Sequence, residues 1–205
     1  MENFIYFIGD KTTNEVVVID PAWDVKFLLE EAKKNNLVVR AALITHGHFD
    51  HTNGAEELLK HLDIPIYINE IEASFFKFNW LKENIKKTKS SDSLKIGNFE
   101  IQFIHTPGHT PGSQCFLISN NLVSGDTLFI NGCGRCDFPG GDVEQMFDTI
   151  YNKLMKMNDD TIILPGHNYA DKTQDTIKNQ KVTNPYMQYD NLMAFVGRRM
   201  PQIRN

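Results

Sequence analysis

The sequence predicts an α/β fold in which two mixed β-sheets pack face to face and helices cover both outer faces, a four-layer αββα sandwich. Strand-like segments occur in two blocks, residues 4–68 and 99–164, and each block has helical segments of its own. The length of 205 residues, with 41% hydrophobic and 23% charged residues, suits one substantial core. No repeat, low-complexity tract or linker is visible, so residues 1–205 are expected to form a single domain with a short helical tail at about 171–205.

The first block opens with a predicted β-hairpin. Apolar residues 4–8 and 16–19 flank the polar segment 10–14, and Asp20-Pro21 ends the second strand because proline cannot donate a ladder hydrogen bond. The elements expected next are a helix capped by Asp24 and running to about Asn35, a nearly continuous apolar strand over Val38–Thr45, a polar loop over His46–Asn53, a helix over Gly54–His61 and a strand over Ile64–Ile68.

An aromatic helical segment, Glu70–Leu81, and a polar stretch, Lys82–Ser93, separate the two blocks; the polar stretch is expected to be a surface loop or a frayed helix. The predicted strands of the second block are Phe99–Ile104, Gln114–Ile118, Leu122–Ser124 and Thr161–Leu164. Its predicted helices are Asp142–Met157, which carries apolar residues on one side, Asp171–Lys181 and Asn191–Arg199.

Charge and composition argue against several classes of function. The formal net charge is −5, and nucleic acid is not an expected partner because phosphate binding draws on clustered Lys and Arg. The local exception is a run of lysines interpreted as a solvated helix face: Lys82, Lys86, Lys87 and Lys89. No stretch approaches the ~20 apolar residues of a membrane span, the N-terminus lacks signal-peptide features, and three cysteines are too few for a disulfide framework. The cytoplasm is therefore the expected compartment.

The segment Thr45-His46-Gly47-His48-Phe49-Asp50-His51 concentrates side chains that bind metals. His46 and His48 stand two apart directly after a buried strand, so an extended backbone aims both imidazoles to the same side. Asp50 and His51 come where the chain turns toward the next helix, and they can face a second point. Histidines with an interleaved carboxylate suit divalent ions such as Zn, Fe or Mn. A polar loop whose side chains merely hydrogen-bond one another would explain a single histidine, but not four ligand-type residues at this spacing.

Three further candidate ligands sit just past the ends of predicted strands. His109 lies in the turn-rich loop 105–113, Asp126 follows the strand that ends at Ser124, and His167 follows the strand that ends at Leu164. Loops at the strand ends of a rigid sheet commonly present functional groups. The sequence therefore predicts that these side chains complete the metal site.

Four motifs, T-H-x-H-x-D-H, P-G-H-T, G-D-T-L-F-x-x-G-C-G-R and P-G-H-x-Y, occur in this order. With the flanking sequence from about Asp20 to Tyr169, they resemble the metallo-β-lactamase superfamily and, within it, glyoxalase II (hydroxyacylglutathione hydrolase). The resemblance implies the metallo-β-lactamase fold and a two-metal site. The implied ligands are His46, His48 and His109 for metal one, Asp50, His51 and His167 for metal two, and Asp126 as the bridge between them. His105 matches no ligand position and is expected either to hydrogen-bond to a metal ligand or to pack against its neighbours.

The same resemblance implies a chemistry. Two divalent ions, zinc before iron or manganese, would share a water and lower its pKa toward roughly 7. The hypothesis is a hydrolase of thioesters or esters in which this metal-bridging hydroxide attacks the carbonyl and one metal holds the oxyanion. Asp50, besides ligating, would orient the hydroxide as a catalytic residue. The expected partner is a small-molecule thioester of the glutathione-linked kind, and no feature of the sequence indicates an oligomeric state.

Arg135 and Tyr169 are the candidate substrate-binding residues. In the family the loop around Arg135 approaches the substrate, where a basic residue would meet a carboxylate of a glutathione-like thiol. A surface ion pair with Asp137 or Asp142 is an equal alternative. Tyr169 matches the tyrosine that contacts the glutathione part in glyoxalase II, and this interpretation is favoured over simple packing.

Two other patterns are interpreted as structural. Cys133 and Cys136 form a C-x2-C pair, but a zinc ribbon needs a second pair that Cys115 alone cannot provide. Two free thiols are therefore expected rather than a redox pair. The aromatic segment Phe75–Trp80 could line a substrate cleft. Aromatic residues at such spacing more often pack in the hydrophobic core, and core packing is the interpretation preferred for this segment.

Two departures from glyoxalase II weaken the link to glutathione. The residues after Tyr169 are too few for the long helical extension that helps bind glutathione, and Cys136–Asp142 replaces the family's aromatic-Glu-Gly pattern. The sequence Gly-Cys-Gly-Arg-x-Asp-Phe also resembles the persulfide dioxygenases, in which one iron, held by residues matching His46, His109 and Asp126, oxidises glutathione persulfide with O2. That family keeps much of the second site's sequence too, so the motifs do not exclude it. The turn at residues 20–23 and the glycine before His167 favour the hydrolase, and the dioxygenase is the alternative.

Overall fold

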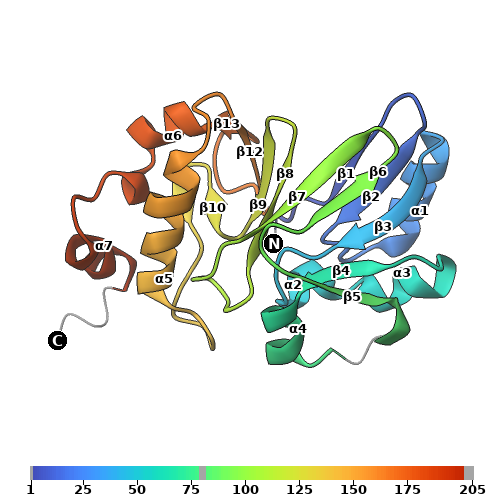
Figure 1. Cartoon of the computed structure of the whole chain (residues 1–205), viewed down its shortest axis with the longest axis horizontal. Coiled ribbons are helices and arrows are strands. Elements are labelled where there is room, and N and C mark those ends of the chain that lie inside the picture. Colours follow the sequence, from blue (N-terminus) through green and yellow to red (C-terminus); the bar gives the residue numbers. More distant parts are fainter. Residues whose placement is uncertain (1, 79–81, 201–205) are drawn as a thin grey trace.

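The computed structural model describes residues 2–78 and 82–200, and its two β-sheets pack with helices outside them (Figure 1). The strand order is β1-β2-β3-β4-β5 in the first sheet and β13-β12-β9-β8-β7-β6 in the second, with a separate two-stranded ribbon, β10-β11. Both sheets are mixed. Of the described pairs, β1–β2 is antiparallel in an otherwise parallel first sheet, and β12–β9 is parallel in an otherwise antiparallel second sheet. The predicted fold class is confirmed.

The elements of the first half are β1 (Tyr6–Gly9), β2 (Glu15–Ile19), α1 (Val25–Lys34), β3 (Val38–Leu43), α2 (Phe49–Thr52), α3 (Ala55–His61), β4 (Ile66–Asn69), α4 (Glu70–Phe76), the 3-10 turn η1 (Lys82–Asn84) and β5 (Ile85–Thr88). The strands of the second half are β6 (Ser93–Ile96), β7 (Phe99–His105), β8 (Gln114–Ile118), β9 (Asn121–Gly125), β10 (Leu128–Phe129), β11 (Gly132–Cys133), β12 (Ile162–Pro165) and β13 (Asp175–Thr176). Its helices and helical turns are α5 (Val143–Asp148), η2 (Thr149–Lys153), η3 (Leu154–Lys156), α6 (Ile177–Thr183), η4 (Pro185–Met187) and α7 (Leu192–Arg199).

Alternation of side chains along the strands builds the layers. In β2, Val17 belongs to the buried cluster between the two sheets, whereas Val18 belongs to the cluster beneath α1 and α3. In β9, Val123 joins the cluster between the sheets and Leu122 the cluster beneath α5, α6 and α7. Because successive side chains of a strand point to opposite faces, each central strand contributes to two apolar layers. The three resulting clusters hold the strand ends that carry the site.

The N-cap predicted for the first helix is present in the structure. The Asp24 carboxylate accepts from Phe27 N at 2.9 Å, as expected of the predicted N-cap. Asp142 likewise caps α5, but the prediction of one regular helix from Asp142 to Met157 is wrong in its second half, because a π-helical and then a 3-10 turn follow Asp148. The apolar spacing continues through these turns, so the pattern alone does not show the change in hydrogen bonding.

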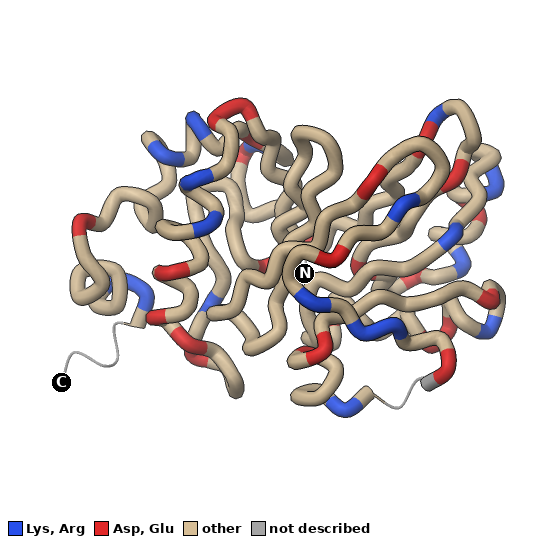
Figure 2. The backbone as a smooth tube through the Cα atoms, viewed as in Figure 1, with Lys and Arg blue, Asp and Glu red and all other residues tan. Residues whose placement is uncertain are grey.

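The interpretation of the lysine-rich stretch as a surface loop or a solvated helix face is wrong at its centre, although Lys82 lies in the helical turn η1 and Lys89 in the loop before β6. Lys86 and Lys87 lie exposed on β5, at the edge of the first sheet. Lysines on an edge strand oppose pairing with another chain, and this accounts for their concentration here. In Figure 2 the basic and acidic residues are interspersed along the described backbone rather than gathered on one element.

Two further helix predictions need correction at their ends. Residues 171–174 are not helical, and Asp175–Thr176 forms β13 against β12 before α6 begins at Ile177. The aromatic helix predicted for Glu70–Leu81 ends at Phe76, where Lys77 takes a left-handed conformation, and residues 79–81 lie outside the described residues. None of the described helices is long and apolar enough to cross a membrane.

Candidate metal centre

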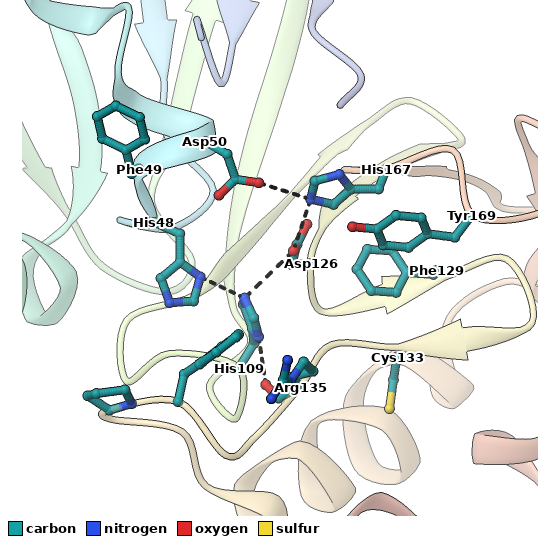
Figure 3. A pocket seen from close by; sticks show the side chains of 12 residues that line it. His48, Phe49, Asp50, His109, Asp126, Phe129, Cys133, Arg135, His167 and Tyr169 are labelled. Carbon is teal, nitrogen blue, oxygen red and sulfur yellow. Dashed lines mark hydrogen bonds and ion pairs between the residues drawn. The ribbon is translucent and has the colours of Figure 1, made fainter. Parts of the chain in front are cut away.

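The predicted ligand-type side chains converge where strand ends of the two sheets meet. Three come from segments after β7, β9 and β12, namely His109, Asp126 and His167, and the others from the loop and helix after β3 (Figure 3). The two sheets are joined directly at strand ends, because Gln114 N at the start of β8 donates to Thr45 O after β3 at 2.9 Å. Two separate sets have their ligand atoms within 4.8 Å of one another: His46, His48 and His109, and Asp50, His51 and His167. Asp20, His46 and His51 form a third such group, which overlaps both sets. The structure thus brings together the residues that the motifs indicated.

Asp126 lies between the two sets. Its Oδ1 is 3.3 Å from His51 Nε2, and its Oδ2 is 3.3 Å from His167 Nε2 and 3.7 Å from His109 Nε2. A glycine makes this position accessible, because a Cβ on Gly166 would collide with Asp126 Oδ1. One carboxylate therefore faces both sets of nitrogens.

Hydrogen bonds behind the imidazoles turn a defined nitrogen toward the centre. His109 Nδ1 donates to Arg135 O at 2.6 Å, and His46 Nδ1 lies 3.0 Å from Thr45 Oγ1. His51 Nδ1 lies 2.9 Å from Asp20 Oδ2. In each case Nε2 is left to face the site, the arrangement by which outer partners orient metal-binding histidines.

The chemistry of these side chains fits divalent cations. His46 Nε2 and Asp126 Oδ1 are buried and have no hydrogen-bond partner, which is costly for polar atoms unless an ion satisfies them. Burial also lowers the pKa of His46, of His109, and of His48 to about 4, so these imidazoles are neutral and keep the lone pair that a cation needs. The residues present can hold one cation in each set, with Asp126 shared.

Asp20, read from the sequence as the end of a strand, supports this site. It is 3% exposed and accepts from Thr45 N at 2.7 Å and from Thr45 Oγ1 at 2.6 Å, in addition to its contact with His51. Burial lowers the pKa of His51, but the carboxylates of Asp126 and Asp20 outweigh it and raise that pKa well above its usual value. Asp20 therefore orients His51 and, after Asp126, contributes to raising its pKa.

Replacing Asp20 should weaken the second set more than the first, which Asp20 reaches only through Thr45. In Asp20→Ala, His51 loses the partner of Nδ1, so affinity for a cation at Asp50, His51 and His167 should fall by about 10–100-fold. Titration with Zn²⁺, followed by metal content after dialysis, measures this loss. The exposed aspartate in Asp160→Ala serves as the control. Equal weakening of both cation sites, or of neither, would contradict the role given to Asp20.

Two other supporting residues lie outside any recognised motif. Asn3 donates from Nδ2 to Asp50 Oδ2 at 3.2 Å and accepts from Trp23 Nε1 at 3.2 Å. Glu72 on α4 is fully buried and accepts hydrogen bonds from Gly47 N, Thr110 Oγ1 and Gly112 N. Glu72 thus ties the loop that carries His46 and His48 to the loop that carries His109.

A cleft of about 700 Å³ opens over the centre, and both candidate substrate-binding residues line it. Arg135 forms the surface ion pair that was one alternative, with Nε and Nη2 donating to Asp137 at 2.9 and 2.7 Å, and its guanidinium lies 4.2 Å from the Phe138 ring centroid. Tyr169 is 60% exposed and stacks on His167 with the ring centroids 4.7 Å apart. Both residues remain candidates for contact with substrate.

The remaining residues singled out in the sequence lie around this centre. His105 is directed away, with Nε2 at 2.9 Å from Pro111 O. Cys133 and Cys136 are free and buried, although Cys133 reaches the wall of the cleft. In the aromatic segment, Phe76 packs edge-on against His48 and Phe78 joins the cluster beneath the first sheet's helices, whereas Trp80 lies outside the described residues.

A family model described as "Metallo-beta-lactamase superfamily" matches residues 2–167. The chain belongs to this superfamily. One relative is the "Probable polyketide biosynthesis zinc-dependent hydrolase PksB" of Bacillus subtilis, 30% identical over 95% of this chain and 85% of that protein. Another is the "Hydroxyacylglutathione hydrolase GloC" of Haemophilus influenzae, 33% identical over 83% of this chain and 86% of that protein. The crystal structure of ETHE1 from Myxococcus xanthus superimposes with a TM-score of 0.87 and 27% identity, covering 100% of this chain and 87% of that one. Membership in the superfamily makes the chain a metal-dependent hydrolase with glyoxalase II-like relatives.

Proposed function

We propose that this metallo-β-lactamase superfamily member is a two-metal hydrolase that cleaves a small-molecule thioester. The observation that carries the proposal is the second set, Asp50, His51 and His167, which is complete and faces the same carboxylate, Asp126, as the first set. The names of PksB and GloC support a zinc-dependent hydrolase acting on an acyl thiol compound.

Bound divalent ions would supply a water of lowered pKa and polarise the carbonyl. The chain's own residues would accept the proton and contact the substrate. Asp50, held by Asn3, presents a carboxylate oxygen at the centre that can accept a proton from the attacking water. In the balanced reaction the water oxygen bonds to the acyl carbon, the C–S bond breaks, and a carboxylate, a thiol and one proton result. Arg135 and Tyr169 stand at the cleft wall to contact the substrate.

Metal analysis and two assays on one preparation test this proposal. About two metals per chain, with thioester hydrolysis and no oxygen uptake, is the expected result. One iron per chain, with oxygen consumption that depends on glutathione persulfide, would establish the persulfide dioxygenase instead. Reconstitution of the metal-free protein with Zn²⁺, Fe²⁺ and Mn²⁺ in parallel identifies the ion that supports turnover.

A further inference from the structure

The walls of the cleft are largely apolar apart from the ligand-type residues. Besides those residues, the lining consists of Phe49, Phe129, Cys133, Arg135, Phe138, Pro139 and Tyr169. Figure 3 shows Phe49 on one side of the centre and Phe129 with Tyr169 on the other. The rings come from separate segments, namely α2, β10, the loop after β11 and the loop after β12, so no single local pattern accounts for them.

Several of these rings remain exposed at the mouth of the cleft. Phe49 is 72%, Tyr169 60% and Phe138 40% exposed. Trp23, 46% exposed, meets Phe49 edge-on with the ring centroids 6.2 Å apart and so extends the rim. Exposed aromatic rings gathered around a cavity indicate a surface that binds an apolar group, because burying them releases ordered water.

The charges around the rim disfavour an anionic ligand. Arg135 is the only cationic side chain among the lining residues, and Asp137 already neutralises it through two hydrogen bonds. Tyr169 also lines a second hollow, whose other lining residues include the acidic Glu2 and Asp171. Glutathione carries two carboxylates and one ammonium group, and recognition of the carboxylates would call for unpaired cations, which the described lining residues of the cleft do not supply.

We infer that the substrate is a thioester with an uncharged, apolar acyl chain, which the aromatic rim (Trp23, Phe49, Phe129, Phe138 and Tyr169) covers, and that a neutral thiol serves as well as the glutathione tripeptide. This inference rests on the proposed thioester hydrolysis. It assigns selectivity to the rim rather than to Arg135.

Four thioesters, built from two acyl groups and two thiols, test the inference with the zinc-loaded protein. The acyl groups are lactoyl and hexanoyl, and the thiols are glutathione and N-acetylcysteamine. The hexanoyl group has three more carbons than lactoyl and lacks its hydroxyl. We expect kcat/KM to rise by about tenfold from lactoyl to hexanoyl on either thiol, which corresponds to about two of these carbons leaving water. Replacing glutathione by N-acetylcysteamine should not lower it.

Substitutions in the aromatic rim test whether it causes the preference for the hexanoyl group. Phe49→Ala and Phe138→Ala should raise KM for the hexanoyl thioesters more than for the lactoyl ones. Phe27→Ala, which removes a ring 56% exposed on α1 outside the cleft, is the matched control. Binding of the uncleavable thioether S-hexyl-N-acetylcysteamine, measured by calorimetry, gives a readout that does not depend on turnover. Phe49→Ala should weaken this binding, and Phe27→Ala should not.

The outcomes separate the two proposals. Hydrolysis that favours lactoylglutathione over hexanoyl-N-acetylcysteamine would overturn the apolar specificity and leave the hydrolase standing. Binding of the thioether through Phe49 without hydrolysis of any thioester would overturn the hydrolase and retain the apolar recognition. If the protein neither binds the thioether nor cleaves a thioester, both fail.

Discussion

Asp126→Ala is expected to remove bound metal and turnover together. This carboxylate faces nitrogens of both ligand sets, at 3.3 Å from His51 and from His167 and 3.7 Å from His109. Without it each set loses an anionic oxygen, and the charge of two neighbouring cations is no longer shared. Since outer partners of metal ligands already contribute about 10–100-fold, turnover should fall by well over about 100-fold. Metal content after gel filtration and initial hydrolysis rates measure both losses on the same sample.

Two companion variants sharpen this test. Asp126→Asn keeps the shape of the side chain and removes its charge, so it should lose metal while the fold, followed by circular dichroism, is retained. Asp148→Ala changes an exposed aspartate that bonds to Asn152, and it should keep both metal and activity. If Asp126→Ala retained substantial turnover, neither the shared position of this carboxylate nor the two-metal proposal would survive.

The convergence of the seven side chains could be predicted because each follows a recognisable apolar run or lies in one compact motif. His46 follows β3 and His167 follows β12, and these strands could be read from continuous apolar residues. The apolar pattern could not predict that the end of β3, at Thr45, contacts the start of β8, at Gln114. The resemblance, rather than periodicity, indicated that these loops meet.

The supporting residues could not be predicted because each is an isolated polar residue with no spacing to mark it. Asn3 reaches Asp50 across 47 positions, and Glu72 reaches Thr110 across 38. In the sequence, Glu72 looks like an ordinary acidic residue in the first turn of a helix. Burial between two loops gives it a role, and burial of a single polar residue is a tertiary property.

The missed strands have a similar explanation. β10, β11 and β13 are two residues long, too short for an alternation to be visible. β5 reads Ile-Lys-Lys-Thr and lies at the edge of the first sheet, where its two lysines are exposed, so its apolar content is low. Edge strands are specified by their neighbour more than by their own residues.

Glu72→Ala is expected to destabilise the fold and loosen the first ligand set. The carboxylate accepts from Gly47 N at 2.6 Å and from Thr110 Oγ1 and Gly112 N at 2.8 Å, and all three partners are buried. Alanine would leave the two backbone donors unsatisfied and a cavity behind, so the free energy of unfolding should fall by about 3–5 kcal/mol. Urea denaturation of the metal-free protein measures this change without interference from bound ions.

Glu72→Gln separates the hydrogen bonds from the charge. Oε1 accepts from Gly47 and Thr110 and Oε2 from Gly112, so a glutamine can keep the first two bonds while its amide group faces Gly112 N, donor to donor. Its loss of stability should therefore be smaller than that of alanine, and its zinc affinity at the histidines of the first set intermediate. Glu70→Ala, on the same helix and at the surface, should change neither. Equal stability of Glu72→Ala and the unmodified chain would show that the two loops hold their positions without this carboxylate.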